Sequence, residues 1–164
     1  MNWLFLAMLA MLALPGCAGI TSAGSEAITP VETLYTSSQC GGLDQPEVVW
    51  IADAGTWRQR YAQMMSLQIT PPPLPVVDFS RDGVLLIAMG QQTTGGYGLS
   101  LSGTTATVQD GVLTMRVEWR EPRPGYAQTQ VMTSPCLVVK LPEGAFSRIR
   151  VVDQAGQVRL DGRR

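Results

Sequence analysis

The sequence predicts an α+β domain: a mainly antiparallel β-sheet, folded as a sandwich or a barrel-like sheet, with one N-terminal amphipathic helix. Three observations predict it. One early segment has apolar residues at helical spacing, several later segments have the pattern of strands, and turn signals such as QDG and PEG separate them. The 164 residues, 45% of them hydrophobic, suffice for one domain with a sizeable core.

The helix is expected in AGTWRQRYAQMMS, residues 54–66, with Asp53 or Thr56 as its N-cap. Four apolar side chains recur there at i, i+4, i+7 and i+8, which favours a face that packs on the core over one that binds a ligand. They are Trp57, Tyr61, Met64 and Met65. TPPPLP (residues 70–75) ends the helix and predicts an extended linker, with a polyproline ligand as the alternative.

Six segments are expected to form strands, because they alternate with period two or are apolar over the length of a strand. They are residues 31–37, 84–90, 99–102, 112–119, 129–142 and 146–153. The clearest alternation lies in VLTMRVEW, and VLLIAMG is typical of a buried central strand. Pro135 interrupts the segment 129–142, which predicts an edge strand or a bulge there.

Charge and histidine content argue against two functional classes. A net charge of −1 does not suit nucleic-acid binding, and the locally basic RLDGRR at the end is expected to be a frayed, solvated tail. The chain has no histidine, which removes the commonest general base and the commonest metal ligand. We therefore expect a non-enzymatic protein without metal or cofactor. An enzyme that uses the carboxylates of Glu118 or Glu121 is the alternative.

Residues 1–16 are predicted to be a signal peptide. Their apolar run, residues 3–14, spans about 18 Å as a helix, which is too short to cross a bilayer. The sequence Leu-Pro-Gly-Cys at residues 14–17 resembles a bacterial lipobox and predicts lipid attachment at Cys17. A secreted protein without lipid and an uncleaved apolar N-terminus are the alternatives.

The lipobox predicts where the domain resides. Residues 17–30 are expected to form the lipidated N-terminus and a flexible tether, because they are mostly small and polar. Residues 31–164 would be a single globular domain. Ala18 follows the lipidated cysteine, and by resemblance to Gram-negative sorting patterns this favours the outer membrane, with the domain facing the periplasm.

Export changes the interpretation of the two remaining cysteines, Cys40 and Cys136. An even number of cysteines in an oxidising compartment favours a disulfide. It would close a loop of about 97 residues and contribute on the order of 4–5 kcal/mol of stability. The alternatives are two buried free thiols and a catalytic thiol, which would lack a histidine to activate it.

The segment MGQQTTGGYG, residues 89–98, does not have the pattern of a phosphate-binding loop. A Walker loop requires Gly-Lys-Ser or Gly-Lys-Thr, and a dinucleotide fingerprint requires a helix after the glycines, where this chain has a strand pattern. We interpret it as a loop between adjacent strands, in which Gly95 and Gly96 supply backbone angles that side chains disfavour.

The stretch from about residue 76 to 142 resembles the C-terminal domain of the PrcB family, which is named for a non-catalytic subunit of a spirochaete surface protease complex. The resemblance lies in Asp78-Phe79, Met89-Gly90, Thr94-Gly95-Gly96-Tyr97, Pro122 with Pro124-Gly125, Gln130-Val131 and Thr133-Ser134-Pro135. It implies a protein-binding or protease-stabilising subunit whose partner is another envelope protein, with a protease as the candidate.

A second resemblance concerns the same glycines. TTGGYG is similar to the Thr-Thr-Gly-Tyr/Phe loop of chagasin-like cysteine-protease inhibitors, which are immunoglobulin-like sandwiches. This implies, as the alternative function, a protease inhibitor that presents residues 93–97. An extra glycine and Gln91-Gln92 in place of Asn-Pro depart from that pattern.

Both resemblances point to two exposed loops that contact a partner. The candidate residues are Thr93, Thr94, Gly95, Gly96 and Tyr97 in one loop, and Arg123, Pro124, Gly125 and Tyr126 in the other. Tyr and Arg are residue types that supply much of the binding energy at interfaces. The alternative is that Tyr97 packs inside and that both loops are ordinary turns.

Overall fold

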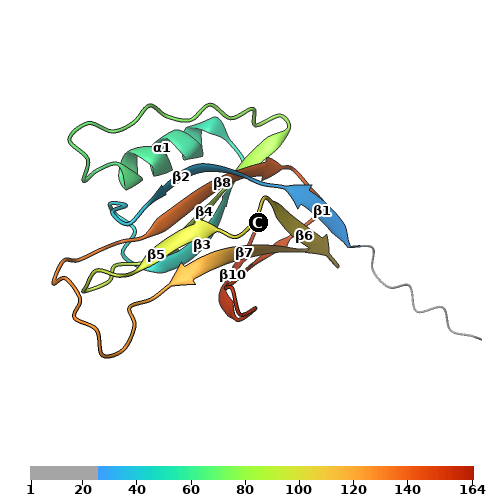
Figure 1. Ribbon diagram of the computed structural model, residues 1–164. Coiled ribbons are helices and arrows are strands. Elements are labelled where there is room, and N and C mark those ends of the chain that lie inside the picture. The colour runs from blue at the N-terminus through green and yellow to red at the C-terminus, as the bar shows by residue number, and fades with distance from the viewer. Residues whose placement is uncertain (1–25) are drawn as a thin grey trace, which may run out of the picture.

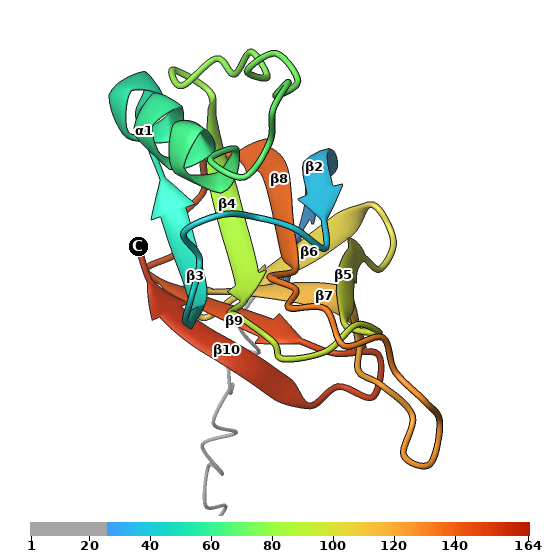
Figure 2. The ribbon, with the colours of Figure 1, turned by 90° about the vertical axis from the view of Figure 1, so that its left-hand side faces the viewer.

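Two β-sheets pack face to face, and one helix covers the outer face of the smaller sheet (Figure 1 and Figure 2). The structure is a computed structural model that describes residues 26–164. The predicted signal peptide, residues 1–16, and the predicted lipid-attachment residue Cys17 lie outside the described residues. Within residues 26–164, no helix has the length and apolar character needed to cross a bilayer.

The larger sheet has the strand order β1-β6-β7-β9-β10, and β5 pairs with the end of β7. Its pairs are antiparallel except β7 with β9, which is parallel. The strands are β1 (Ala27–Pro30), β5 (Gly98–Leu101), β6 (Thr105–Gln109), β7 (Val112–Arg120), β9 (Arg148–Val152) and β10 (Val158–Arg163). The smaller sheet is antiparallel throughout, in the order β2-β8-β4-β3. Its strands are β2 (Glu32–Ser37), β3 (Pro46–Ile51), β4 (Asp82–Met89) and β8 (Cys136–Pro142).

The main core lies between the two sheets. β7 contributes its predicted alternate residues to this core: Leu113, Met115, Val117 and Trp119. β4 is apolar throughout because both of its faces are covered. Leu85 and Ile87 face the larger sheet, whereas Val84 and Leu86 belong to a second core beneath the helix. The prediction of a mainly antiparallel β fold is thus confirmed.

Helix α1 (Ala54–Met64) lies against the smaller sheet, with Trp57, Tyr61 and Met64 buried as the spacing predicts. The side chain of Asp53 caps it, accepting from the N–H groups of Gly55 and Thr56 at 2.9 Å each. The prediction of an N-terminal helix is wrong in its placement, because residues 27–51 form β1, β2 and β3 before α1 begins.

The proline segment, residues 70–75, binds to the helix of its own chain. Trp57 Nε1 donates to the carbonyl oxygen of Pro75 at 3.0 Å, and the Tyr61 hydroxyl donates to that of Pro72 at 3.0 Å. Because prolines have no N–H to donate, this segment does not form a regular strand ladder, and its carbonyl oxygens are available as acceptors. Burial, and then the neighbouring Tyr35, raise the pKa of Tyr61 above its ordinary value.

Three further sequence predictions are corrected by strand pairing. Residues 27–30, expected in the tether, form β1, which pairs with β6. Most of the basic end, expected to be a frayed tail, forms β10 and pairs with β9. The predicted strand 129–142 begins only at Cys136, and β8 is an inner strand rather than an edge. Proline lacks the N–H for a ladder, so Pro135 precedes the strand instead of interrupting it.

Candidate functional site

The predicted binding residues lie in two loops at the same end of the sheets, at the lower right of Figure 2. We define the glycine loop as residues 91–97, which join β4 to β5, and the proline loop as residues 121–135, which join β7 to β8. The structure brings these two loops together.

Hydrogen bonds join the glycine loop to the second half of the proline loop. Gln92 and Thr133 exchange two backbone hydrogen bonds, of 2.7 and 2.9 Å. The Thr133 hydroxyl donates to the carbonyl oxygen of Thr94 at 3.0 Å, and Gly95 N–H donates to that of Thr129 at 2.9 Å. The glycine loop is therefore held along most of its length.

The two glycines allow this close approach. A Cβ at Gly95 would overlap the Thr129 hydroxyl, and one at Gly96 would lie 2.6 Å from Gln128 Oε1. Gly96 also has φ near +93°, a conformation that residues with side chains rarely adopt. The glycines thus serve contact between the loops, which agrees with the interpretation of this segment as a connection between strands.

The predicted residues differ in their accessibility. Tyr97 is half-buried and packs against the main core, as the alternative interpretation expected, and Gly95 is buried. Thr94 is partly buried, whereas Thr93 and Gly96 are exposed. All four candidates in the proline loop are exposed: Arg123, Pro124, Gly125 and Tyr126. Accessible contact groups therefore lie mainly on the proline loop.

Two residues that sequence reasoning did not select extend this accessible surface. Tyr126, Val131 and Met132 are 69%, 52% and 60% exposed, although they are large and apolar. Val131 and Met132 fall in the predicted strand 129–142, so the sequence did not indicate that they are exposed in a loop. The signal that could have found them is Pro135, because a strand that starts after proline leaves residues 129–134 in the loop.

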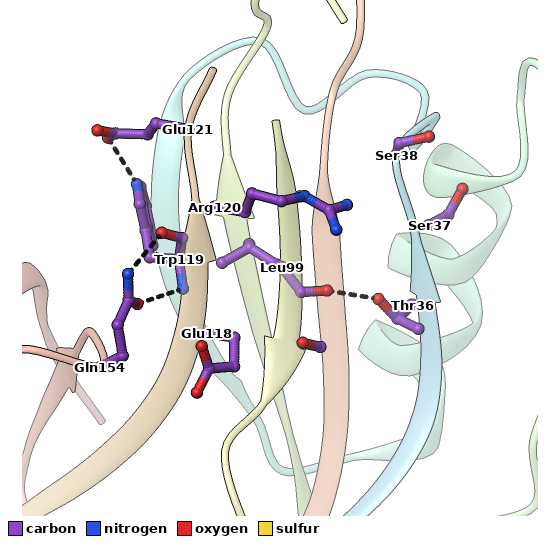
Figure 3. Close-up of a pocket in the computed structure, with 11 residues that line it drawn as sticks. Thr36, Ser37, Ser38, Leu99, Glu118, Trp119, Arg120, Glu121 and Gln154 are labelled. Atoms are coloured by element: carbon purple, nitrogen blue, oxygen red, sulfur yellow. Dashed lines mark hydrogen bonds between the residues drawn. The ribbon is translucent and has the colours of Figure 1, made fainter. Parts of the chain in front are cut away.

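The ends of the proline loop are fixed. At its start, Trp119 Nε1 donates to Glu121 Oε1 at 3.0 Å, and Arg159 Nη1 donates to the same oxygen at 3.1 Å. The Arg159 guanidinium also lies over the Trp119 ring, 5.5 Å from its centroid. Gln154 pairs with the backbone N–H and carbonyl of Trp119, as Figure 3 shows.

Asp153 orients Arg159 in turn. Its buried carboxylate accepts from Arg159 Nε at 2.8 Å and from the N–H groups of Ala155 and Gln157 at 2.9 Å each. Burial acts to raise the pKa of Asp153, but the hydrogen bonds from Gln157, Arg159 and Ala155 outweigh it, so the pKa lies below its ordinary value. The carboxylate is therefore ionised at neutral pH and holds the arginine beneath the loop.

A disulfide joins Cys40 to Cys136, as the sequence predicted, and it fixes the other end of the proline loop. Close to it, Cys40 N–H donates to the carbonyl oxygen of Ser134, and Ser134 N–H donates to that of Ser38, both at 2.9 Å. The Ser134 hydroxyl donates to the carbonyl oxygen of Leu43 at 2.9 Å. The proline loop thus has rigid ends and an exposed middle.

The two carboxylates considered for catalysis are engaged elsewhere. Glu121 accepts the hydrogen bonds of Trp119 and Arg159, and Glu118 accepts one from the Ser102 hydroxyl at 3.2 Å. Among the residues that the structure describes, no three side chains of Cys, Asp or Glu gather in a way that could hold a metal ion.

The comparisons with known proteins bear on the stretch that carries both loops. The sequence model of the PrcB C-terminal family matches residues 84–142, from β4 to the end of β8. No curated protein and no solved structure matches the chain significantly. The resemblance predicted from the motifs is confirmed over this range, in which the chain matches the PrcB C-terminal family.

Proposed function

We propose that this chain is a non-enzymatic lipoprotein of the bacterial cell envelope that binds another envelope protein through the proline loop. The observation that carries the proposal is the exposure of Tyr126, Val131 and Met132 on a loop with fixed ends. Large apolar side chains that lie outside the core contribute little to stability, and they are typical of surfaces that contact another molecule. The resemblance to the PrcB family makes an exported protease the first candidate for the partner. The first candidate for the role of this chain is then to stabilise that protease.

The fixed ends support binding energetically. A loop that is already ordered loses less conformational entropy when a partner binds than a flexible one does. The clamps by the disulfide and by Arg159 leave the middle of the proline loop as the accessible part. Tyrosine adds a large contact area with only two side-chain torsions to fix.

The inhibitor alternative has less support. It requires residues 93–97 to enter a protease cleft, yet Gly95 is buried and Tyr97 packs against the core. The absence of histidine from the whole chain supports a non-enzymatic role, since the remaining candidate carboxylates are bound in structural contacts.

The replacement of Tyr126 and Met132 by alanine tests the binding surface. We expect the double variant to capture its partner at least tenfold less well, because truncation of central interface residues typically costs about 2 kcal/mol. The full chain would carry an affinity tag, be cross-linked in the cells that produce it and be extracted in detergent. Mass spectrometry would then quantify the exported proteins captured with it.

Ile69→Ala provides the matched control, because Ile69 is fully exposed and apolar but belongs to the segment between α1 and β4. Figure 2 shows that segment at the opposite end of the smaller sheet from both loops. It should capture the partner like the wild type. Equal capture by wild type and by the Tyr126 and Met132 variant would contradict the proposed surface. Capture of general chaperones alone would contradict the proposed function.

Cys17→Ser tests the membrane anchor. In cells fed labelled palmitate, we expect the wild-type chain to carry the label and the variant to lack it, because the thiol is the proposed site of acylation. The Cys40→Ala variant serves as the control, since Cys40 is bonded to Cys136 and should not affect labelling. Label on the Cys17→Ser chain, or none on the wild type, would remove the anchor from the proposal.

A further inference from the structure

The outer face of the larger sheet carries an excess of positive charge. Helix α1 covers the smaller sheet at the top of Figure 2, and β9 and β10 lie below that sheet. Along β7, β9 and the part of β10 after its bulge, the residues that alternate with the core residues point outward. The charged ones are Arg116, Glu118, Arg120, Arg148, Arg150, Asp161 and Arg163. Five arginines thus face outward with two carboxylates, although the net charge of the chain is −1.

Two of these arginines lie directly opposite each other. Arg148 of β9 and Arg163 of β10 are register partners, so their side chains leave adjacent strands on the same face. Like charges in this arrangement repel each other and destabilise the strand pair. The next outward pair along the same strands, Arg150 and Asp161, is complementary and forms an ion pair at 3.3 Å. The six ion pairs formed within residues 26–164 include neither Arg148 nor Arg163, so a bound anion would relieve their repulsion.

A shallow hollow of about 580 Å³ lies at this pair of arginines. Arg148 and Arg163 line it together with Ser147, whose hydroxyl adds an uncharged donor. Asp161 also lines the hollow, but its carboxylate is paired with Arg150. Guanidinium groups bind phosphate through parallel hydrogen bonds, so the hollow has the donors that a phosphate group requires.

Two further charged residues lie near the hollow. Arg164 lines it, but its guanidinium is paired with Glu143 at 2.7 Å. Asp110 is exposed in the turn between β6 and β7, and Ser147 N–H donates to the carbonyl oxygen of the next residue, Gly111, at 2.9 Å. Asp110 forms no ion pair with either arginine of the hollow, so it weakens their positive potential without neutralising it.

The hollow lies at the end of the larger sheet where the described chain begins. One row of register partners crosses the sheet from β1 to β10: Ala27, Val108, Leu113, Ile149 and Gly162. Arg148 and Arg163 are the sequence neighbours of its last two members. The four strand spacings between β1 and β10 amount to about 19 Å.

The proline loop lies at the opposite end of the sheet. β7 starts at Val112, which is the register partner of Arg148, and the proline loop follows its other end, Arg120. Figure 1 accordingly shows β1 and the proline loop on opposite sides of the molecule. A contact at the hollow would therefore leave the proline loop accessible.

The predicted lipid anchor brings a membrane within reach of this end. Cys17 precedes Glu26 by nine residues, which span at most about 30 Å. Ile28 of β1 is 72% exposed, and its register partner Thr107 faces outward, so Ile28 adds an apolar side chain to the same outer face. Arginines beside an exposed apolar residue are typical of surfaces that lie on anionic bilayers.

We propose that this end of the outer face binds the anionic headgroups of the bilayer to which the chain is anchored, with one headgroup phosphate between Arg148 and Arg163. Each basic residue close to an anionic bilayer strengthens binding about fivefold. The contact would orient the domain so that the proline loop points away from the membrane, toward its partner. This inference rests on the proposed function, because it requires the lipid anchor.

The test compares the full lipidated chain in nanodiscs of phosphatidylcholine alone and in discs that contain about 30% phosphatidylglycerol, the source of net negative charge. Hydroxyphenylglyoxal modifies accessible guanidinium groups, and mass spectrometry gives the rate at each arginine. We expect Arg148 and Arg163 to react at least fivefold more slowly in the anionic discs. Arg58, exposed on α1, should react equally in both, and about 0.5 M salt should remove the difference.

A double variant and a matched control identify the residues responsible. With Arg148→Gln and Arg163→Gln together, Arg150, two residues along β9, should lose the protection that it has in the wild type. Both replaced side chains are exposed and their removal relieves a repulsion, so this variant should unfold at the wild-type urea midpoint or above it. Arg58→Gln, which removes an exposed arginine from α1, should keep the wild-type protection of Arg148.

Three results would overturn the inference. One is equal reaction of Arg148 and Arg163 in both kinds of disc. The second is equal protection in neutral discs by soluble inorganic phosphate, which would make the hollow a site for a free anion. The third is a chain that stays with neither kind of disc, which would contradict the anchor itself. Replacement of Tyr126 and Met132 by alanine should leave the protection unchanged, so membrane contact and partner binding fail separately.

Discussion

Removal of the Cys40–Cys136 disulfide is expected to lower the free energy of unfolding by about 4 kcal/mol. The two cysteines are 96 residues apart in the sequence, so the bond excludes many conformations of the unfolded chain. Cys40→Ala with Cys136→Ala is the suitable variant. Serine would bury two hydroxyls in the core beneath the helix and add a separate penalty.

Urea denaturation of the full chain measures this effect, and the unfolding midpoint should fall by about 2 M. Dithiothreitol should lower the midpoint of the wild type and leave that of the double variant unchanged. Equal midpoints of the oxidised wild type and the double variant would contradict the prediction. A stabilising disulfide also supports the proposed export, because such bonds persist mainly in oxidising compartments.

The parts of the fold that the sequence predicted best are those in which one face of one element decides the pattern. β7 alternates clearly because one face of it meets the core. Trp57, Tyr61 and Met64 mark the helix for the same reason. In both cases the residues of one short segment suffice to predict which of its side chains are buried.

The two failed predictions of strand pairing differ in the distance to the partner: β1 pairs with a strand far away in the sequence, whereas β10 pairs with the strand that directly precedes it. Residues 27–30 are small and polar enough to form a tether, and they become β1 only because β6 offers them a strand edge. The end of the chain becomes β10 because β9 lies beside it. The composition of residues 27–30 carries no information about the first pairing, since that edge is built by residues 70 or more positions away.

The same contrast between local patterns and long-range contacts applies to the candidate site. The motifs selected two loops as candidate binding residues, but the accessibility of these residues depends on long-range contacts such as those between Gly95 and Thr129. In the structure, the exposed candidate residues lie mainly in the proline loop and not in the glycine loop.

Trp57→Ala is the second variant with a large expected effect. Trp57 is 2% exposed, and its truncation should lower the free energy of unfolding by about 3–5 kcal/mol through the cavity that it leaves. Trp57→Phe separates the two roles of the side chain. It keeps much of the ring volume but removes the hydrogen bond from Nε1 to Pro75, and it should cost about 1–2 kcal/mol.

The two variants should also differ from wild type in the segment that follows the helix. Between residues 66 and 76 of that segment, most side chains are exposed, Ile69 and Val76 almost fully, whereas the carbonyl oxygens of Pro75 and Pro72 accept from Trp57 and Tyr61. Brief thermolysin treatment under native conditions should therefore cut near Leu67 faster in both variants than in wild type, even where Trp57→Phe remains largely folded. If Trp57→Phe were cut at the wild-type rate, the hydrogen bond to Pro75 would not be what fixes the proline segment on the helix.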